Sequence, residues 1–163
     1  TKGNFVTADP TQIPSDFQCG SIYYEHLKKS VKTTDSENWY AHYHLGLMHW
    51  FYGKYKKARK AFKRSIALQP SAWAYHGLAV LAFPAKEKCV SYIRKGLVLC
   101  DYDLSYVKEA FRIFISAEAF SVLLDCYSHL PEKIQTESRI HFCYLTALSK
   151  TGQYKKGYDI LIH

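Results

Sequence analysis

Residues 39–62 read WYAHYHLGLMHWFYGKYKKARKAF and decide the fold. An aromatic, apolar segment of helical length ends at Gly53, and a basic segment follows in which Ala58, Phe62 and Ile66 recur every fourth residue. Residues at this spacing lie on one face of a helix. The stretch therefore predicts two helices joined by a short turn at Gly53.

The same pattern returns along the chain. The segments LKKSV (27–31), FKRSI (62–66) and IRKGL (93–97) each combine a large apolar residue, two basic residues, a small residue and an aliphatic one. They begin 35 and 31 residues apart, and the Gly-x-Tyr turn at Gly53 recurs 99 residues later at Gly152. No sustained alternation of apolar and polar residues indicates a strand. A period of about 33 residues then indicates stacked helical hairpins.

Residues 39–72 resemble one complete tetratricopeptide repeat (TPR). Three residues depart from the family's pattern, namely His42 in place of tryptophan, His49 in place of tyrosine and Ser65 in place of alanine. The resemblance implies that the repeat's small residues let two helices approach closely, while its large ones fill the space between hairpins. It is carried by Leu45, Gly46, Gly53, Tyr55, Ala58, Phe62 and Pro70.

The remainder of the chain resembles the family more weakly. We expect residues 1–19 to form a linker or an extended arm, and residues 20–163 to form a TPR-like helical repeat domain. The predicted fold is all-α, a right-handed superhelical solenoid of antiparallel helical hairpins with partly degenerate repeats. Its predicted parts are a half unit at 20–38, units at 39–71, 72–102 and 103–137, and a truncated unit at 138–163.

A narrower resemblance concerns the order of the segments. NWYAHYHLG, SAWAYHGLAVLA, RIHFCYLTAL and GQYKKGYDIL together resemble the C-terminal TPR region of large bacterial proteins that carry a domain of unknown function similar to carbohydrate-processing enzymes. This implies an accessory region of a carbohydrate-related multidomain protein, in contact with adjacent domains of the same chain. The segment YDILIH (158–163) lacks the polar face of a capping repeat. We therefore expect this end of the chain either to mediate a homodimer or to be covered by further sequence.

Composition limits the cellular environment in which the protein is expected to reside. The chain of 163 residues is 48% hydrophobic and 22% charged, and no apolar run reaches the roughly 20 residues of a membrane-spanning helix. We therefore expect no membrane insertion. The five cysteines include no C-x-x-C pair, which argues against a zinc ribbon and favours reduced thiols in the cytoplasm.

The sequence contains no recognisable catalytic or metal-binding motif. His42, His44 and His49 fall on one predicted helix, but no two of them have the i, i+4 spacing of paired zinc ligands. A nucleophile elbow, a glycine-rich phosphate loop and an H-E-x-x-H motif are all missing, and the acidic residues are scattered. We predict a non-catalytic protein with no catalytic residue, no metal site and no cofactor.

The TPR resemblance implies a concave groove on the first helix of each unit, where family members usually bind peptides or partner helices. We therefore expect a protein-interaction or scaffolding module with aromatic anchors in this groove. The alternative is that the same rings pack against the leading arm or an adjacent repeat. The pattern with which some TPR domains clamp a terminal carboxylate is absent. The implied groove residues are Tyr40, Tyr43, Leu47, Trp50, Trp73, His76, Val80, Phe83, Arg139 and Phe142.

The net charge of +8 raises a further possibility. Seven cations fall within residues 54–64, and pairs of cations recur once per unit. On the convex side of a TPR arrangement they would form a basic ridge, either as a solvated face or as a binding surface for RNA or an acidic partner. Because the aromatic residues lie mainly on the first helices, nucleic acid is disfavoured. The ridge residues are Lys28, Lys29, Lys63, Arg64, Arg94 and Lys95.

Overall fold

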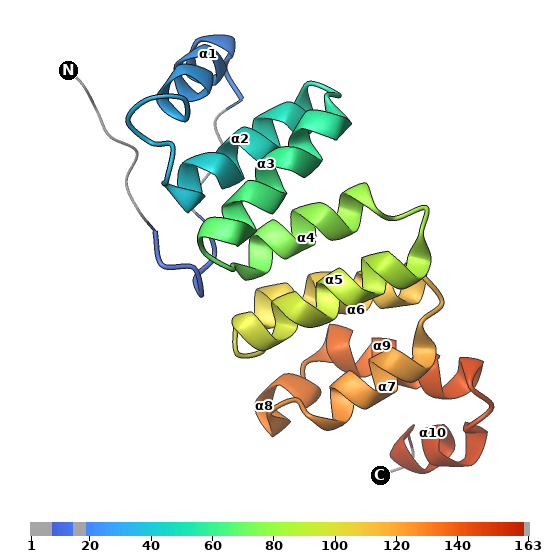
Figure 1. The fold of residues 1–163 in the computed structure, drawn as a ribbon. Helices are drawn as coiled ribbons and strands as arrows, with labels where there is room; N and C mark the ends of the chain where they lie inside the picture. The colour runs from blue at the N-terminus through green and yellow to red at the C-terminus, as the bar shows by residue number, and fades with distance from the viewer. Residues whose placement is uncertain (1–7, 15–18, 162–163) are drawn as a thin grey trace. The chain divides into compact units, whose positions relative to one another are not determined.

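The computed structural model describes residues 8–14 and 19–161, apart from the side chain of Leu161. All regular structure in these residues is helical, so the all-α prediction is confirmed (Figure 1). The helices are α1 (Ser21–Ser30), α2 (Trp39–Phe51), α3 (Tyr55–Leu68), α4 (Ala72–Leu81), α5 (Lys86–Leu99), α6 (Leu104–Ser116), α7 (Phe120–Ser128), α8 (Glu132–Gln135), α9 (Ser138–Lys150) and α10 (Tyr154–Leu161).

The chain divides into two compact units, one up to Asp101 and one from Tyr102 onward. In the first unit α2 packs against α3 and α4 packs against α5, which gives two helical hairpins. The hairpins meet through α3 and α4, and α2 also contacts α4. Neighbouring first helices thus lie side by side, as expected from the repeat pattern.

Local chemistry sets the bounds of the α2–α3 hairpin. The Asn38 side chain caps α2 by accepting hydrogen bonds from the backbone N–H groups of Tyr40 and Ala41, at 3.0 and 3.2 Å. The helix ends at a turn in which Gly53 has φ +69°. Glycine adopts this left-handed conformation without the steric cost of a Cβ atom. Gly152, in the recurring turn, has φ +75°.

Phe62 holds the two hairpins together. Its ring is fully buried between a glycine of α2 and a glycine of α4. A Cβ atom at Gly46 would lie 2.6 Å from the ring, and so would one at Gly77. The small residues therefore leave the space that the ring fills. Nearby, the fully buried Ser65 hydroxyl donates a hydrogen bond to the Trp39 carbonyl at 2.9 Å, which explains how the core accepts serine there.

A second apolar cluster joins α1 to α2. It contains Leu27 from α1 and Met48 from α2, together with Ala61 from α3. At its edge the Tyr24 hydroxyl lies 2.6 Å from Nδ1 of His49. Helix α1 therefore packs as an additional helix against the α2–α3 hairpin.

The second unit has its own core around α6, α7 and α9. Tyr127 and Tyr144 stack with ring centroids 3.8 Å apart, and Lys108 forms an ion pair with Glu137 at 2.7 Å. The sequence pattern did not predict the short helix α8, which follows Pro131. The buried residues of this core include Tyr106, Phe111, Phe114, Leu123, Ile140 and Leu148.

Part of the expected arm is described. Residues 8–14 form no helix, and Ala8 packs against the apolar cluster that contains Phe62. The Tyr52 hydroxyl donates a hydrogen bond to the Cys19 carbonyl at 3.2 Å. Residues 1–7 and 15–18 of the expected arm, and the end of the YDILIH segment at 162–163, lie outside the described residues.

Candidate functional site

The aromatic residues at the start of α2 lie in the core. Tyr40 and Tyr43 are each 5% exposed and belong to the cluster around Phe62. The two tyrosine rings lie 6.1 Å apart, and His44 packs edge-on to Tyr40 at 4.4 Å. Burial raises the pKa of Tyr43. These two rings therefore offer little free surface to a partner, and Ala8 covers part of the same cluster.

The ends of α2 and α4 are more open. Trp50 in the last turn of α2 is 40% exposed, and Phe83, just after α4, is 39% exposed. The other implied groove positions on these two helices are half-buried, namely Leu47, Trp73, His76 and Val80. The accessible part of the expected groove in the first unit thus consists of two exposed rings and these half-buried residues, of which His76 is polar.

In the second unit the implied groove residues lie on α9. Arg139 and Phe142 are both exposed. The hydroxyl of Thr146, one turn further along, donates a hydrogen bond to the Phe142 carbonyl at 2.9 Å. The exposed Phe142 ring is accessible to a partner within the second unit.

The residues of the expected basic ridge come from α1, α3 and α5. Lys28 is half-buried and the other five are exposed. Lys28 lies 2.6 Å from Glu25, and Arg64 lies 2.6 Å from Glu37. These ion pairs reduce the free charge along the ridge. That the ridge binds a partner stays a prediction.

The histidines of α2 have structural contacts. Nε2 of His42 lies 2.9 Å from the Ser36 carbonyl, and His49 contacts the Tyr24 hydroxyl. Burial lowers the pKa of both His44 and His49 to about 4, and nearby lysines add to the effect at His49. Both imidazoles are thus neutral at physiological pH. Within residues 8–14 and 19–161, no group of three or more His, Cys, Asp or Glu side chains is placed to hold a metal ion.

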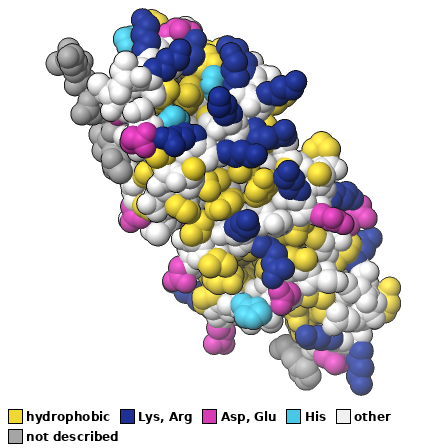
Figure 2. All heavy atoms as spheres, in the orientation of Figure 1, with side chains coloured by type: hydrophobic (Ala, Val, Ile, Leu, Met, Phe, Trp, Pro, Cys, Tyr) yellow, Lys and Arg dark blue, Asp and Glu magenta, His cyan; other side chains and the backbone are white. Residues whose placement is uncertain are grey.

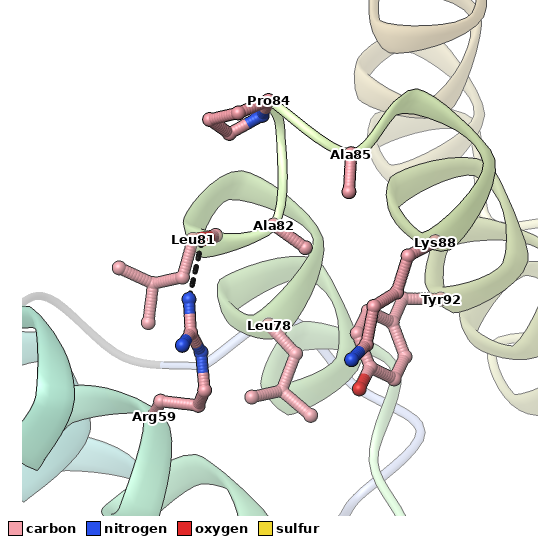
Figure 3. A pocket seen from close by; sticks show the side chains of 8 residues that line it. All are labelled: Arg59, Leu78, Leu81, Ala82, Pro84, Ala85, Lys88 and Tyr92. Atoms are coloured by element: carbon pink, nitrogen blue, oxygen red, sulfur yellow. Dashed lines mark hydrogen bonds between the residues drawn. The ribbon is translucent and has the colours of Figure 1, made fainter.

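A surface cavity of about 220 Å³ lies between α3, α4 and α5 (Figure 3). Arg59 reaches across it and donates a hydrogen bond to the Leu81 carbonyl at 2.9 Å, so its guanidinium caps the end of α4. The sequence pattern did not distinguish Arg59 from the neighbouring cations. Its acceptor is the backbone carbonyl of Leu81 in another hairpin, and every residue has such a carbonyl. The cavity is lined by Arg59, Leu78, Leu81, Ala82, Pro84, Ala85, Lys88 and Tyr92.

A cluster of exposed rings at the α2–α3 turn was also not predicted as a site. Phe51 is 58% exposed and Tyr55 is 57% exposed. Phe51 is the last residue of α2 and Tyr55 is the first of α3, so neither occupies a helix position that the TPR resemblance assigns to the groove. None of the helices in the described part of the chain is long and apolar enough to cross a membrane.

The exposed rings of α10 bear on the expected homodimer. Tyr154 and Tyr158 are both exposed on the last described helix. Dimerisation through this repeat stays a prediction, which light scattering over a range of protein concentrations would test.

Comparison with known protein families gives one match, over residues 39–72, to the family described as Tetratricopeptide repeat. A comparison with curated proteins gives no match. The matched segment contains the whole α2–α3 hairpin, including Gly46, the turn at Gly53 and Phe62. The resemblance to the tetratricopeptide repeat family is therefore confirmed for the hairpin at residues 39–72.

Proposed function

We propose that the chain is a non-catalytic protein-interaction or scaffolding module that binds an extended segment of a partner across the ends of α2 and α4. The similarity of residues 39–72 to a tetratricopeptide repeat supports a role in protein interaction. The observation that carries the proposed position is the pair of exposed rings at the ends of two neighbouring first helices, Trp50 in the last turn of α2 and Phe83 just after α4. Half-buried Leu47 and Val80 supply further apolar surface on the same helices.

The physical argument rests on partial burial. Trp50 and Phe83 each keep about two fifths of their surface in water, 40% and 39%, and a partner would remove it. Aromatic side chains in such positions supply much of the binding free energy at protein interfaces. Tyr43 contributes indirectly, because its buried ring supports α2.

The test uses a displayed library of random peptides, followed by fluorescence anisotropy with the best enriched peptide. Trp50→Ala with Phe83→Ala should weaken binding by at least tenfold, since each anchor is worth more than about 1 kcal/mol. Val98→Ala is the matched control, because Val98 is an exposed apolar residue on the second helix α5. Tyr43→Ala is unsuitable, because deleting a buried ring would destabilise the fold.

The outcomes separate the alternatives. Unchanged affinity in the double variant, or a library that yields no binder, would overturn the proposed groove. Affinity that falls steeply with salt but ignores Trp50 and Phe83 would instead favour the basic ridge and an acidic partner or RNA. Far-UV circular dichroism must show equal helical content in all variants.

The proposed setting rests on fewer observations. None of the five cysteines, which all lie among the described residues, forms a disulfide, and this fits a reducing compartment such as the cytoplasm. A bacterial source and a role beside carbohydrate-processing domains rest on the sequence resemblance alone. The full reading frame would test both, because an upstream enzyme-like β domain is expected.

A further inference from the structure

The α2–α3 hairpin ends in a protruding turn. All residues from 51 to 57 are exposed, and we call this segment the hairpin tip. Two of its rings, Phe51 and Tyr55, keep more than half of their surface in water, at 58% and 57%. Apolar rings at the end of a hairpin contribute little to the core, so their exposure is a reason to consider a binding role.

Helix α1 contacts the tip and exposes an aliphatic residue in its first turn. The Tyr52 ring stacks on Tyr24 of α1, with centroids 4.9 Å apart, and the Tyr52 hydroxyl reaches Cys19 just before α1. In the first turn of α1, Ile22 is 75% exposed. Exposed apolar side chains therefore come both from the tip and from the helix that contacts it.

The surface around the tip is positive, although Glu25 of α1 pairs with Lys28 at 2.6 Å. No aspartate or glutamate occurs from residue 39 to residue 86, whereas residues 54–64 contain seven lysines and arginines. Lys54, Lys56 and Lys57 lie at the N-terminus of α3, where the helix dipole disfavours cations. Figure 2 shows lysine and arginine side chains gathered over the part of the molecule that holds α1 and α3.

Charges from α1 and α3 converge at the tip. Lys54 lies over the rings of both Tyr24 and Tyr52, 4.8 and 5.7 Å from their centroids. Lys28 and Lys57, together with Lys54, contribute to lowering the pKa of His49. The lysines are thus close enough to one another to act on one partner.

We propose that the hairpin tip binds the surface of a membrane that contains anionic lipid, with Phe51, Tyr55 and Ile22 in the interface and the lysines on headgroup phosphates. A bilayer surface presents negative charge above an apolar layer, which complements protruding apolar side chains among lysines. Aromatic residues are favoured at this boundary. The chain would lie on the membrane without crossing it.

The ring geometry favours lipid over single-stranded RNA. Bases bind by stacking on free ring faces. At the tip, one face of Tyr52 is taken by Tyr24, and Phe51 packs edge-on to Tyr52 at 5.2 Å. Ile22 has no ring to offer. Apolar contact with lipid can use Ile22 as well as the rings, whereas base stacking can use the rings alone.

The test is sedimentation of the chain with vesicles of phosphatidylcholine alone or with 30 mol% phosphatidylglycerol, a composition we estimate gives about the surface charge of an anionic leaflet. Binding is expected only to the anionic vesicles. Lys56→Gln with Lys57→Gln should lower the partition coefficient about 30-fold, since each lysine is worth about 1 kcal/mol near such a surface. Phe51→Ser with Tyr55→Ser should lower it at least tenfold.

Matched controls come from other surfaces. Val98→Ser removes an exposed apolar side chain from α5, and Lys155→Gln removes an exposed cation from α10. Both should bind anionic vesicles like the unmodified chain. Binding to vesicles of phosphatidylcholine alone, or anionic binding that the serine variant leaves unchanged, would overturn the proposal. So would tighter, variant-sensitive binding of a labelled uridine oligonucleotide, which would assign the tip to RNA.

Discussion

The contact between Phe62 and two glycines makes Gly46→Ala an informative substitution. The added Cβ atom would lie 2.6 Å from Cδ1 and Cε1 of Phe62. The ring has little room to move away, because its far edge lies so close to Gly77 that a Cβ atom there would be 2.6 Å from Phe62 Cζ. Relief of the clash therefore requires a shift of α2 or α4.

The expected magnitude combines two opposing effects. In a helix interior, alanine is normally favoured over glycine by about 1 kcal/mol. Overpacking of a tight core costs about 1–3 kcal/mol, and confinement of Phe62 from both sides places this case near the upper value. Gly46→Ala should therefore lower the free energy of unfolding by about 2 kcal/mol. For a chain of this size, that lowers Tm by roughly 4–8 °C.

The assay is urea unfolding followed by far-UV circular dichroism, with Gly157→Ala as the control. Gly157 also lies in a helix, but its nearest neighbour is Leu148 Cβ at 3.9 Å, so alanine there should be neutral or stabilising. Combining Gly46→Ala with Phe62→Leu should cost less than the sum of the two single changes, because the smaller side chain relieves the clash. A stabilised Gly46→Ala protein, or strictly additive effects, would refute the reasoning.

Three further substitutions or conditions test the first unit. Asn38→Ala removes the cap of α2 and should lower stability by about 1 kcal/mol in urea unfolding; no change would mean the cap is dispensable. Ser65→Ala restores the residue usual in the family but removes the hydrogen bond from the Ser65 hydroxyl to the Trp39 carbonyl, so a loss of about 1 kcal/mol is expected and a gain would contradict the argument. The pKa values of His44 and His49 are lowered from 6.5 to about 4 in the folded protein. As the pH falls, these histidines therefore take up protons in the unfolded chain before they do so in the folded one. Stability is therefore full above about pH 6.5 and should fall as the pH drops towards 4, by up to roughly 1.4 kcal/mol per pH unit for each histidine; a flat Tm between these values would disagree.

The repeat architecture was predictable because its determinants are local. Gly53 and Gly152 lie in turns and have positive φ. Glycine adopts this backbone conformation readily because it has no side chain, so the residue type alone predicts the turn. The spacing of Ala58 and Phe62 likewise fixes which face of α3 is buried. Helix α8 was missed because a single turn of helix after Pro131 has too few residues to show a period.

The candidate site was less predictable because exposure depends on neighbouring elements. Tyr40 and Tyr43 occupy positions that would face a groove in an isolated repeat, yet packing against α3, α4 and Ala8 leaves each only 5% exposed. Phe51 and Tyr55 flank the turn at the end of the hairpin instead, and the packing there leaves them 58% and 57% exposed. A repeat pattern fixes the position of a side chain on a helix, but not what lies against it.

The charge on α3 connects stability to function. Like charges three or four residues apart destabilise a helix, and the spacing of Lys56, Lys60 and Arg64 brings such pairs together. Lysines at the N-terminus add an unfavourable interaction with the helix dipole. Burial of Phe62 offsets these costs, so the packed face of α3 allows its other face to remain highly charged. Neutralising lysines at the tip therefore relieves repulsion within α3. A loss of vesicle binding in such variants would reflect the lost contact with lipid, because the fold itself is not weakened.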